Sequence, residues 1–183
     1  MKNNIDFRNA ESFKIMEMDS RKITKRNFSG RADEYNEKGE RKFSLLIEDE
    51  HLIELLENDG WNIKIPDVEP GEPLKAYLPV FVSWQNPKYI PTIAQVTEKN
   101  GKQKVTYLTE KNIGNLDGAD IERISVQIAP KVWYKKGTTT PGGIKAYLKK
   151  MWFVLIPDEM EALYITNPDY DEEDGITLPF DEE

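Results

Sequence analysis

The feature that most constrains the fold is a long stretch, residues 121–157, that contains no acidic residue after Glu122. Its last part, GIKAYLKKMWFVLIP (Gly143–Pro157), alternates apolar residues with lysines and a tyrosine. Alternation with a period of two is typical of a β-strand that buries one face and exposes the other. The doubled lysine at Lys149 and Lys150 interrupts this alternation and predicts a β-bulge.

The same stretch is rich in lysines and aromatic residues, although the whole chain has a net charge of −8. Cations interleaved with rings on strands are what a surface needs to hold a phosphate backbone while it stacks on bases. A solvent-exposed, lysine-rich hairpin over an ordinary core is the alternative interpretation of this stretch.

The rest of the chain also consists mainly of short strand-like segments. One helix is predicted at Glu50–Asn58, where leucines recur at helical spacing and Gly60 follows as a left-handed cap. Asn100-Gly101 between two strand-like runs predicts a tight hairpin. Many short strands, one helix and glycine-rich hairpins favour a mainly β fold, a Greek-key barrel or a sandwich with long hairpins. The strands are expected at residues 13–18, 23–28, 42–48, 61–65, 74–84, 93–98, 103–109, 121–128, 131–134 and 144–156.

The charge of the chain is segregated along its length. Residues 1–166 hold 25 acids and all 25 bases, whereas residues 167–183 hold eight acids and no base. We therefore expect one nearly neutral domain, 1–166, and a disordered acidic tail, 167–183. A short apolar patch in the tail is predicted to enter a pocket on a partner protein or to fold back on a basic groove, the alternative being a plainly solvated tail. The patch consists of Ile176, Leu178, Pro179 and Phe180.

Several classes of function are not supported by the sequence. The chain has no cysteine and a single histidine, His51, which argues against disulfides, thiolate metal sites and histidine-rich metal sites. No signal peptide and no apolar run long enough to span a membrane is present, which predicts a cytoplasmic protein with no membrane partner. No phosphate-binding loop, dinucleotide fingerprint or nucleophile elbow is found. We expect neither enzymatic activity nor a metal or other cofactor.

Two basic stretches that carry aromatic residues, Arg21–Arg31 and Lys131–Trp152, stand out from the rest. If they share one face, they form a cationic groove with rings for stacking, which is the arrangement that single-stranded nucleic acid requires. Stacking on bases is predicted for Phe28, Trp84, Trp133 and Tyr147. Phosphate contacts are predicted for Arg21, Lys22, Lys25, Arg26, Arg31, Lys131, Lys135, Lys136, Lys145 and Lys149.

The body and the tail together resemble single-stranded DNA-binding proteins of bacteriophages. The resemblance lies in the acidic run Asp171–Asp174 followed by Leu-Pro-Phe, and in three segments of the body, 27–47, 58–64 and 143–156. It implies an OB-like barrel as the body and a tail that recruits replication or recombination proteins. In one respect the chain departs from this pattern, because Asp181-Glu182-Glu183 follow the phenylalanine.

The resemblance implies sequence-independent binding of single-stranded DNA in phage DNA replication or recombination, in the cytoplasm of the bacterial host. Two rival functions remain open at this point. One is a phage protein-interaction module that inhibits or recruits a host factor, as a DNA mimic or an anti-defence protein. The other is a metal-dependent nuclease, although the sequence shows no cluster of carboxylates for it. A homo-oligomer also remains open.

Overall fold

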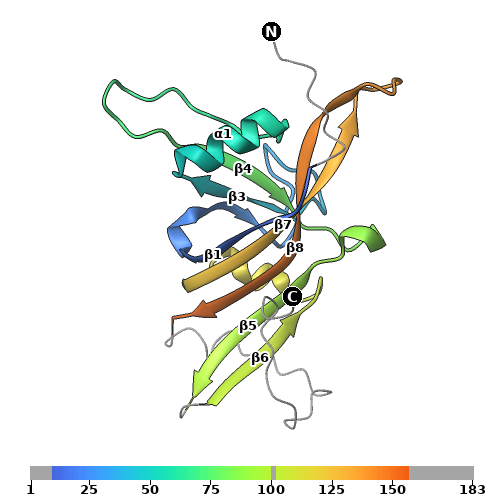
Figure 1. Ribbon diagram of the computed structural model, residues 1–183. Coiled ribbons are helices and arrows are strands. Elements are labelled where there is room, and N and C mark those ends of the chain that lie inside the picture. The colour runs from blue at the N-terminus through green and yellow to red at the C-terminus, as the bar shows by residue number, and fades with distance from the viewer. Residues whose placement is uncertain (1–9, 100–101, 157–183) are drawn as a thin grey trace.

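The computed structural model describes residues 10–99 and 102–156, and in this part of the chain the fold is mainly β (Figure 1). Eight strands and one α-helix are present there, with three short 3-10 turns between them. The order is β1 (Phe13–Asp19), η2 (Ser20–Lys22), β2 (Ile23–Asn27), β3 (Lys42–Ile47), α1 (Glu50–Asp59), β4 (Ala76–Phe81), η3 (Pro87–Tyr89), β5 (Thr92–Lys99), β6 (Lys102–Leu108), η4 (Ile113–Asp117), β7 (Ile121–Tyr134) and β8 (Pro141–Leu155).

The strand order is that of an OB-like Greek-key barrel, which confirms the predicted fold class. The sheet runs β1-β7-β8-β4-β3-β2, and all neighbours on this path are antiparallel except β4 and β8, which are parallel. Only η2 separates β1 from β2, where the Asp19 carboxylate caps the turn by accepting from the Arg21 amide at 2.8 Å. The two strands thus act as halves of one bent strand that pairs with β7 on one side and β3 on the other. This bend closes the barrel.

Alternation places the core inside this barrel, as it does in any strand with one buried face. On β4, Ala76, Leu78 and Val80 are fully buried and belong to the main core cluster. On β8, Ile144, Ala146 and Leu148 are buried first, followed by Met151, Phe153 and Leu155. The step from an even to an odd series marks the predicted bulge, because Gln127 pairs with Lys150 but Ile128 pairs with Leu148. Lys149 is the extra residue.

The helix is confirmed at the predicted place, with both of its ends capped. The Asp49 side chain accepts from the Leu52 amide at 3.1 Å, and Gly60 follows in the left-handed conformation at φ 89°. Ile53 and Leu56 enter the main core, and α1 lies beside β3 (Figure 1).

Two of the predicted elements differ from the structure, and a third prediction falls outside the described residues. Residues 61–65 are not a strand, because only isolated bridges form there, from Trp61 to Ile144 and from Lys64 to Tyr77. The predicted strands 121–128 and 131–134 are one continuous strand, β7, since Ala129 and Pro130 also pair with β8. The predicted tail, 167–183, lies outside the described residues. Within the described part, no helix is long and apolar enough to cross a membrane.

Candidate nucleic-acid interface

A row of three aromatic rings lies at the outward face of β4 and β8, where Phe81 and Tyr147 are partly exposed and Tyr89 is only 8% exposed. Phe81 and Tyr147 are partners in the parallel pairing of these strands, and their ring centroids are 5.8 Å apart. Tyr89, from the turn η3, adds a third ring 4.7 Å from Tyr147. The planes are tilted by only 32° and 34°, so adjacent rings overlap obliquely instead of meeting edge to face. We call Phe81, Tyr147 and Tyr89 the aromatic ladder.

Lysines from four different elements surround the ladder. The Lys42 and Lys145 ammonium groups lie 5.8 and 4.6 Å from the centroid of Phe81. Lys131 lies 5.3 Å from the Tyr147 centroid and 5.5 Å from that of Tyr89, which Lys88 approaches at 5.6 Å. These distances fall within the range of cation–π contacts. The fold therefore builds a cationic, aromatic surface from segments about 100 residues apart.

The face continues along β7 and β8 toward their hairpin. Lys131 pairs with Lys145 and Trp133 pairs with Gly143. Because side chains two positions apart share a face, Lys131, Trp133 and Lys145 lie on the same outward side as Tyr147. Trp133 is 39% exposed. Its ring occupies the space above Gly142, since a Cβ added there would fall 2.1–2.5 Å from three of its atoms. Trp133 lies four residues from Ala129, the partner of Tyr147, which corresponds to about 13 Å along the strand.

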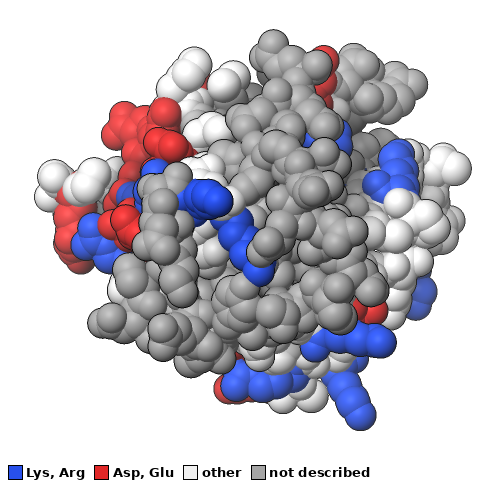
Figure 2. Space-filling model, turned by 90° about the horizontal axis from the view of Figure 1, so that it is seen from below, with Lys and Arg blue, Asp and Glu red and all other residues white. Residues whose placement is uncertain are grey.

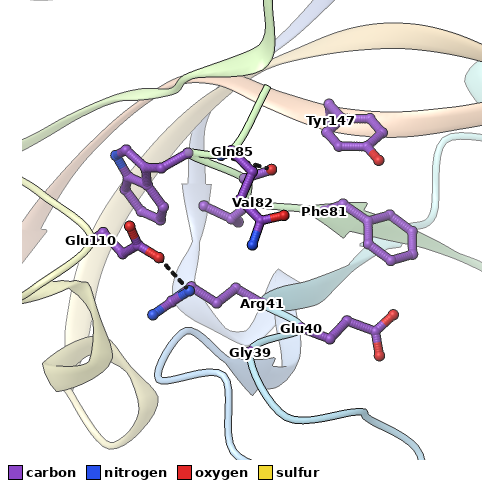
Figure 3. Close-up of a pocket in the computed structure, with 10 residues that line it drawn as sticks. Gly39, Glu40, Arg41, Phe81, Val82, Gln85, Glu110 and Tyr147 are labelled. Atoms are coloured by element: carbon purple, nitrogen blue, oxygen red, sulfur yellow. Dashed lines mark hydrogen bonds and ion pairs between the residues drawn. The ribbon is translucent and has the colours of Figure 1, made fainter. Parts of the chain in front are cut away.

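A small pocket adjoins the other end of the ladder (Figure 3). It has a volume of about 170 Å³ and shares Phe81 and Tyr147 with the ladder. On its opposite side, Arg41 Nη1 donates to Glu110 Oε1 at 3.0 Å. The Arg41 guanidinium also lies 5.8 Å from the centroid of the Trp84 ring. The remaining lining residues are Gly39, Glu40, Val82, Ser83 and Gln85.

The structure brings together most of the residues predicted from the second basic stretch. Lys131, Trp133, Lys145 and Tyr147 share the outward face, as described above. Lys149 is exposed at the bulge of β8, and Lys135 and Lys136 are exposed in the turn that follows β7; Trp84 lines the pocket.

The first basic stretch contributes less to this face. Phe28 is wrong as a stacking residue because its ring is fully buried, 5.3 Å from the ring of Phe43 in the core. Arg26 is a structural anchor that donates to the carbonyls of Leu116 and Ala119, the latter at 2.6 Å. Burial lowers the pKa of Arg26, while the charges of Asp120 and Asp117 oppose this shift.

Ion pairs hold other members of the first stretch. Lys22 pairs with Glu48, and Arg21 binds the Asp19 carboxylate through both Nε and Nη2. The Arg21 guanidinium lowers the pKa of Asp19. Arg31 lies 3.8 Å from Asp117. By contrast, Lys25 is exposed, with its ammonium 5.5 Å from the ring of Tyr77 on the outward face of β4.

Sequence reasoning missed three of the residues that shape the interface. Phe81 is one of them, although Ala76, Leu78 and Val80 take the buried positions of β4 and leave Phe81 on the other side. That alternation was the available signal. Arg41 and Lys42 come into place only through tertiary pairing. The positions of Lys88 and Tyr89 beside the ladder also depend on tertiary contacts.

Charge alone does not single out this interface. Seen from below, basic side chains appear in several separate places, and acidic side chains gather mainly on one side (Figure 2). In residues 10–99 and 102–156, no group of three or more histidine, aspartate or glutamate side chains could hold a metal ion. The combination of rings with lysines distinguishes the face of β4, β7 and β8 from the other described surface.

Comparisons with known proteins identify the family of the chain. No curated protein sequence matches the chain. Among solved structures, gp2.5, a single-stranded DNA-binding protein encoded by bacteriophage T7, is similar with 12% sequence identity and a TM-score of 0.37, over 92% of this chain and 100% of that one. A family model described as "Putative phage ssDNA-binding domain" matches residues 8–180. The chain therefore belongs to this family of phage single-stranded DNA-binding domains.

Proposed function

We propose that this chain binds single-stranded DNA without sequence preference and acts in phage DNA replication or recombination, in the cytoplasm of the infected cell. The observation that carries the proposal is the aromatic ladder with its ring of lysines. Membership in a phage single-stranded DNA-binding family supports it.

The ladder suits unpaired bases for a simple physical reason. A base in single-stranded DNA can offer its π-face to a protein ring, whereas in a duplex both faces are covered by neighbours. Stacking on an aromatic ring contributes about 1–3 kcal/mol per base and tolerates any base. Phe81 and Tyr147 are partly exposed and held in register by the β4–β8 pairing, so little ordering is needed on binding.

The lysines around the ladder supply the phosphate contacts in this proposal. When a base stacks on a ring, the ammonium near that ring can turn outward on its long side chain to meet the adjacent phosphate. Each phosphate neutralised releases counterions and makes binding more dependent on salt. Lys42, Lys88, Lys131 and Lys145 take this role on the ladder. At the ends of the path, the contacts come from Lys25, Arg31, Lys135, Lys136 and Lys149, with Trp133 as a further stacking ring and Trp84 beside the pocket.

The tail has a separate role in the proposal. Its apolar patch, Ile176 with Leu178, Pro179 and Phe180, recruits replication or recombination proteins, and its eight acids compete with DNA for the basic face. This part of the proposal rests on the sequence, because the tail lies outside the described residues.

The direct test is the binding of oligo-dT of about 15 nucleotides to the full chain, measured by fluorescence anisotropy over a range of salt. We expect Lys131→Gln to weaken binding and to reduce the slope of log K against log salt by about 0.7. Lys102→Gln is the matched control, because Lys102 is exposed on β6, away from the ladder. If the two variants weaken oligo-dT binding equally, the ladder is not part of the interface.

Two further results decide the wider proposal. No binding of oligo-dT at low salt would exclude DNA and favour a protein partner. A chain that ends at Thr166 should bind at least as tightly as the full chain, because eight competing charges are gone. Weaker binding by the shortened chain would exclude competition by the tail.

A further inference from the structure

The pocket beside the ladder has room for a small guest only. Its volume of about 170 Å³ is well below the roughly 300–1,000 Å³ typical of pockets for drug-sized ligands. Phe81 and Tyr147 form part of its wall and also belong to the ladder. A strand that stacks its bases along the ladder therefore passes the mouth of this pocket.

The charges in the pocket disfavour a phosphate and favour the edge of a base. Two carboxylates, Glu40 and Glu110, lie in the wall, and both would repel a phosphate. A carboxylate accepts hydrogen bonds only, so it selects a group that carries N–H donors. A guanidinium donates only, and Arg41 stands next to Glu110 at 3.0 Å. The pair thus presents acceptors and donors side by side.

Among the four bases, guanine matches this pair best. Its Watson–Crick edge carries two adjacent donors, N1–H and the N2 amino group, which a carboxylate can accept together. Its O6 and N7 atoms are acceptors, and arginine contacts to these atoms are the commonest specific base contacts in protein–DNA complexes. Thymine offers one N–H between two carbonyl oxygens, so it gives the carboxylate a single donor.

Arg41, the donor of the pair, is held by contacts of its backbone and of its side chain. The backbone carbonyl of Arg41 accepts from the Val82 amide at 2.9 Å, which ties the end of the 28–41 loop to the end of β4. The guanidinium lies over the indole of Trp84, with 5.8 Å between its central carbon and the ring centroid. The Arg41 Nε is buried and has no hydrogen-bond partner among residues 10–99 and 102–156.

We propose that this pocket takes one guanine base from the bound strand, with Glu110 accepting from its N1–H and N2 amino groups and Arg41 donating to its O6 or N7. The inference rests on the proposed single-stranded DNA binding and adds a base preference at one position of the path. Stacking on the ladder remains indifferent to sequence, so the preference concerns a single nucleotide.

The test compares oligo-dT with the same oligonucleotide carrying one central dG, dC or dA, using the full chain at fixed salt. A single dG avoids the four-stranded structures that runs of guanine form. We expect the dG oligonucleotide to bind about tenfold more tightly than oligo-dT, with dC and dA between them. In Glu110→Gln, this ratio should fall close to one, because the amide replaces one of the two acceptor oxygens with an NH2 donor, which opposes a guanine donor. Glu122→Gln, at an exposed position of β7, is the control and should keep the ratio.

Each alternative outcome has a definite meaning. Tight binding of oligo-dT with a dG ratio near one overturns the guanine pocket and leaves the proposed function intact. A preference for dG that survives in Glu110→Gln overturns the assignment of this residue. Failure to bind any oligonucleotide overturns both proposals.

Discussion

The two halves of β8 carry two very different outer faces. In the first half, Lys145 and Tyr147 are partly exposed and belong to the cationic, aromatic surface. In the second half, Trp152 and Val154 are only 5% and 8% exposed. They form a second apolar cluster with side chains of β5 and β6, which includes Ala94.

The bulge at Lys149 separates these faces. Without the extra residue, a strict period of two would carry one side of the strand unchanged from end to end. With it, the buried series shifts from even to odd positions, so the core stays continuous on the inner side. The outer side has different neighbours before and after the bulge. Before it they are lysines of β3 and β7, and after it they are apolar residues of β5 and β6. One strand thereby serves both a binding surface and a second core.

Deletion of Lys149 tests whether this division needs the bulge. Without the extra residue, Leu148 and Met151 are two positions apart, so Met151, Phe153 and Leu155 stay on the inner side. The deletion removes the local bend and twist of the bulge, and we expect a loss of about 1–3 kcal/mol with a cooperative thermal transition. The measurement is circular dichroism on heating. Lys149→Gln keeps the residue count and should melt within about 0.5 kcal/mol of the wild type. Loss of the cooperative transition in the deletion variant would show that the fold depends on the bulge itself.

A pair of ring deletions compares the two faces directly. Trp152→Ala removes a ring that is 5% exposed, and it should lower the free energy of unfolding by about 3–5 kcal/mol. Tyr147→Ala removes a partly exposed ring and should cost about 1 kcal/mol of stability. Its main effect should be on oligo-dT binding, a loss of about 1–3 kcal/mol. Denaturant titration and anisotropy of both variants test the pair. If Tyr147→Ala binds oligo-dT like the wild type, the ladder is not the stacking surface.

The comparison also shows which parts of the structure the sequence predicts. Local patterns predicted most of the strands, the helix, the left-handed Gly60 and the bulge, because each depends on neighbouring residues. The same alternation places Phe81 outside the core. Which elements then lie beside a given ring is set by distant pairings, above all the parallel contact of β4 with β8.

The outcome for Arg26 and Phe28 has the same cause. Both belong to a stretch that is basic and aromatic in sequence. Arg26 reaches carbonyl groups about 90 residues away, and Phe28 packs into the core against Phe43. No local pattern reveals that these positions are taken by structural contacts. A binding residue predicted from composition is therefore best supported where the alternation of its strand also places it outside the core.

The smallest predicted effect concerns the loop 28–41, which borders the binding face and ends in the pocket. The Asp33 carboxylate accepts from the Tyr35 amide at 2.8 Å and from Asn36 Nδ2 at 2.7 Å. These hydrogen bonds lower the pKa of Asp33 below its usual 3.8. Because the folded-state pKa is lowered, the stabilisation is present above pH 3.8 and is lost as the pH falls through the lowered value.

We therefore expect acid to loosen this loop while the second apolar cluster, whose buried members are Ala94, Val96, Trp152 and Val154, stays protected. Amide exchange at Gly39 compared with Val154, measured at decreasing pH, gives the readout. Asp33→Asn keeps one acceptor oxygen but not the charge, so its loop should exchange somewhat faster at neutral pH and change less on acidification. Equal protection of Gly39 and Val154 down to pH values below 3.8 would contradict this difference in robustness between the binding edge and the second core.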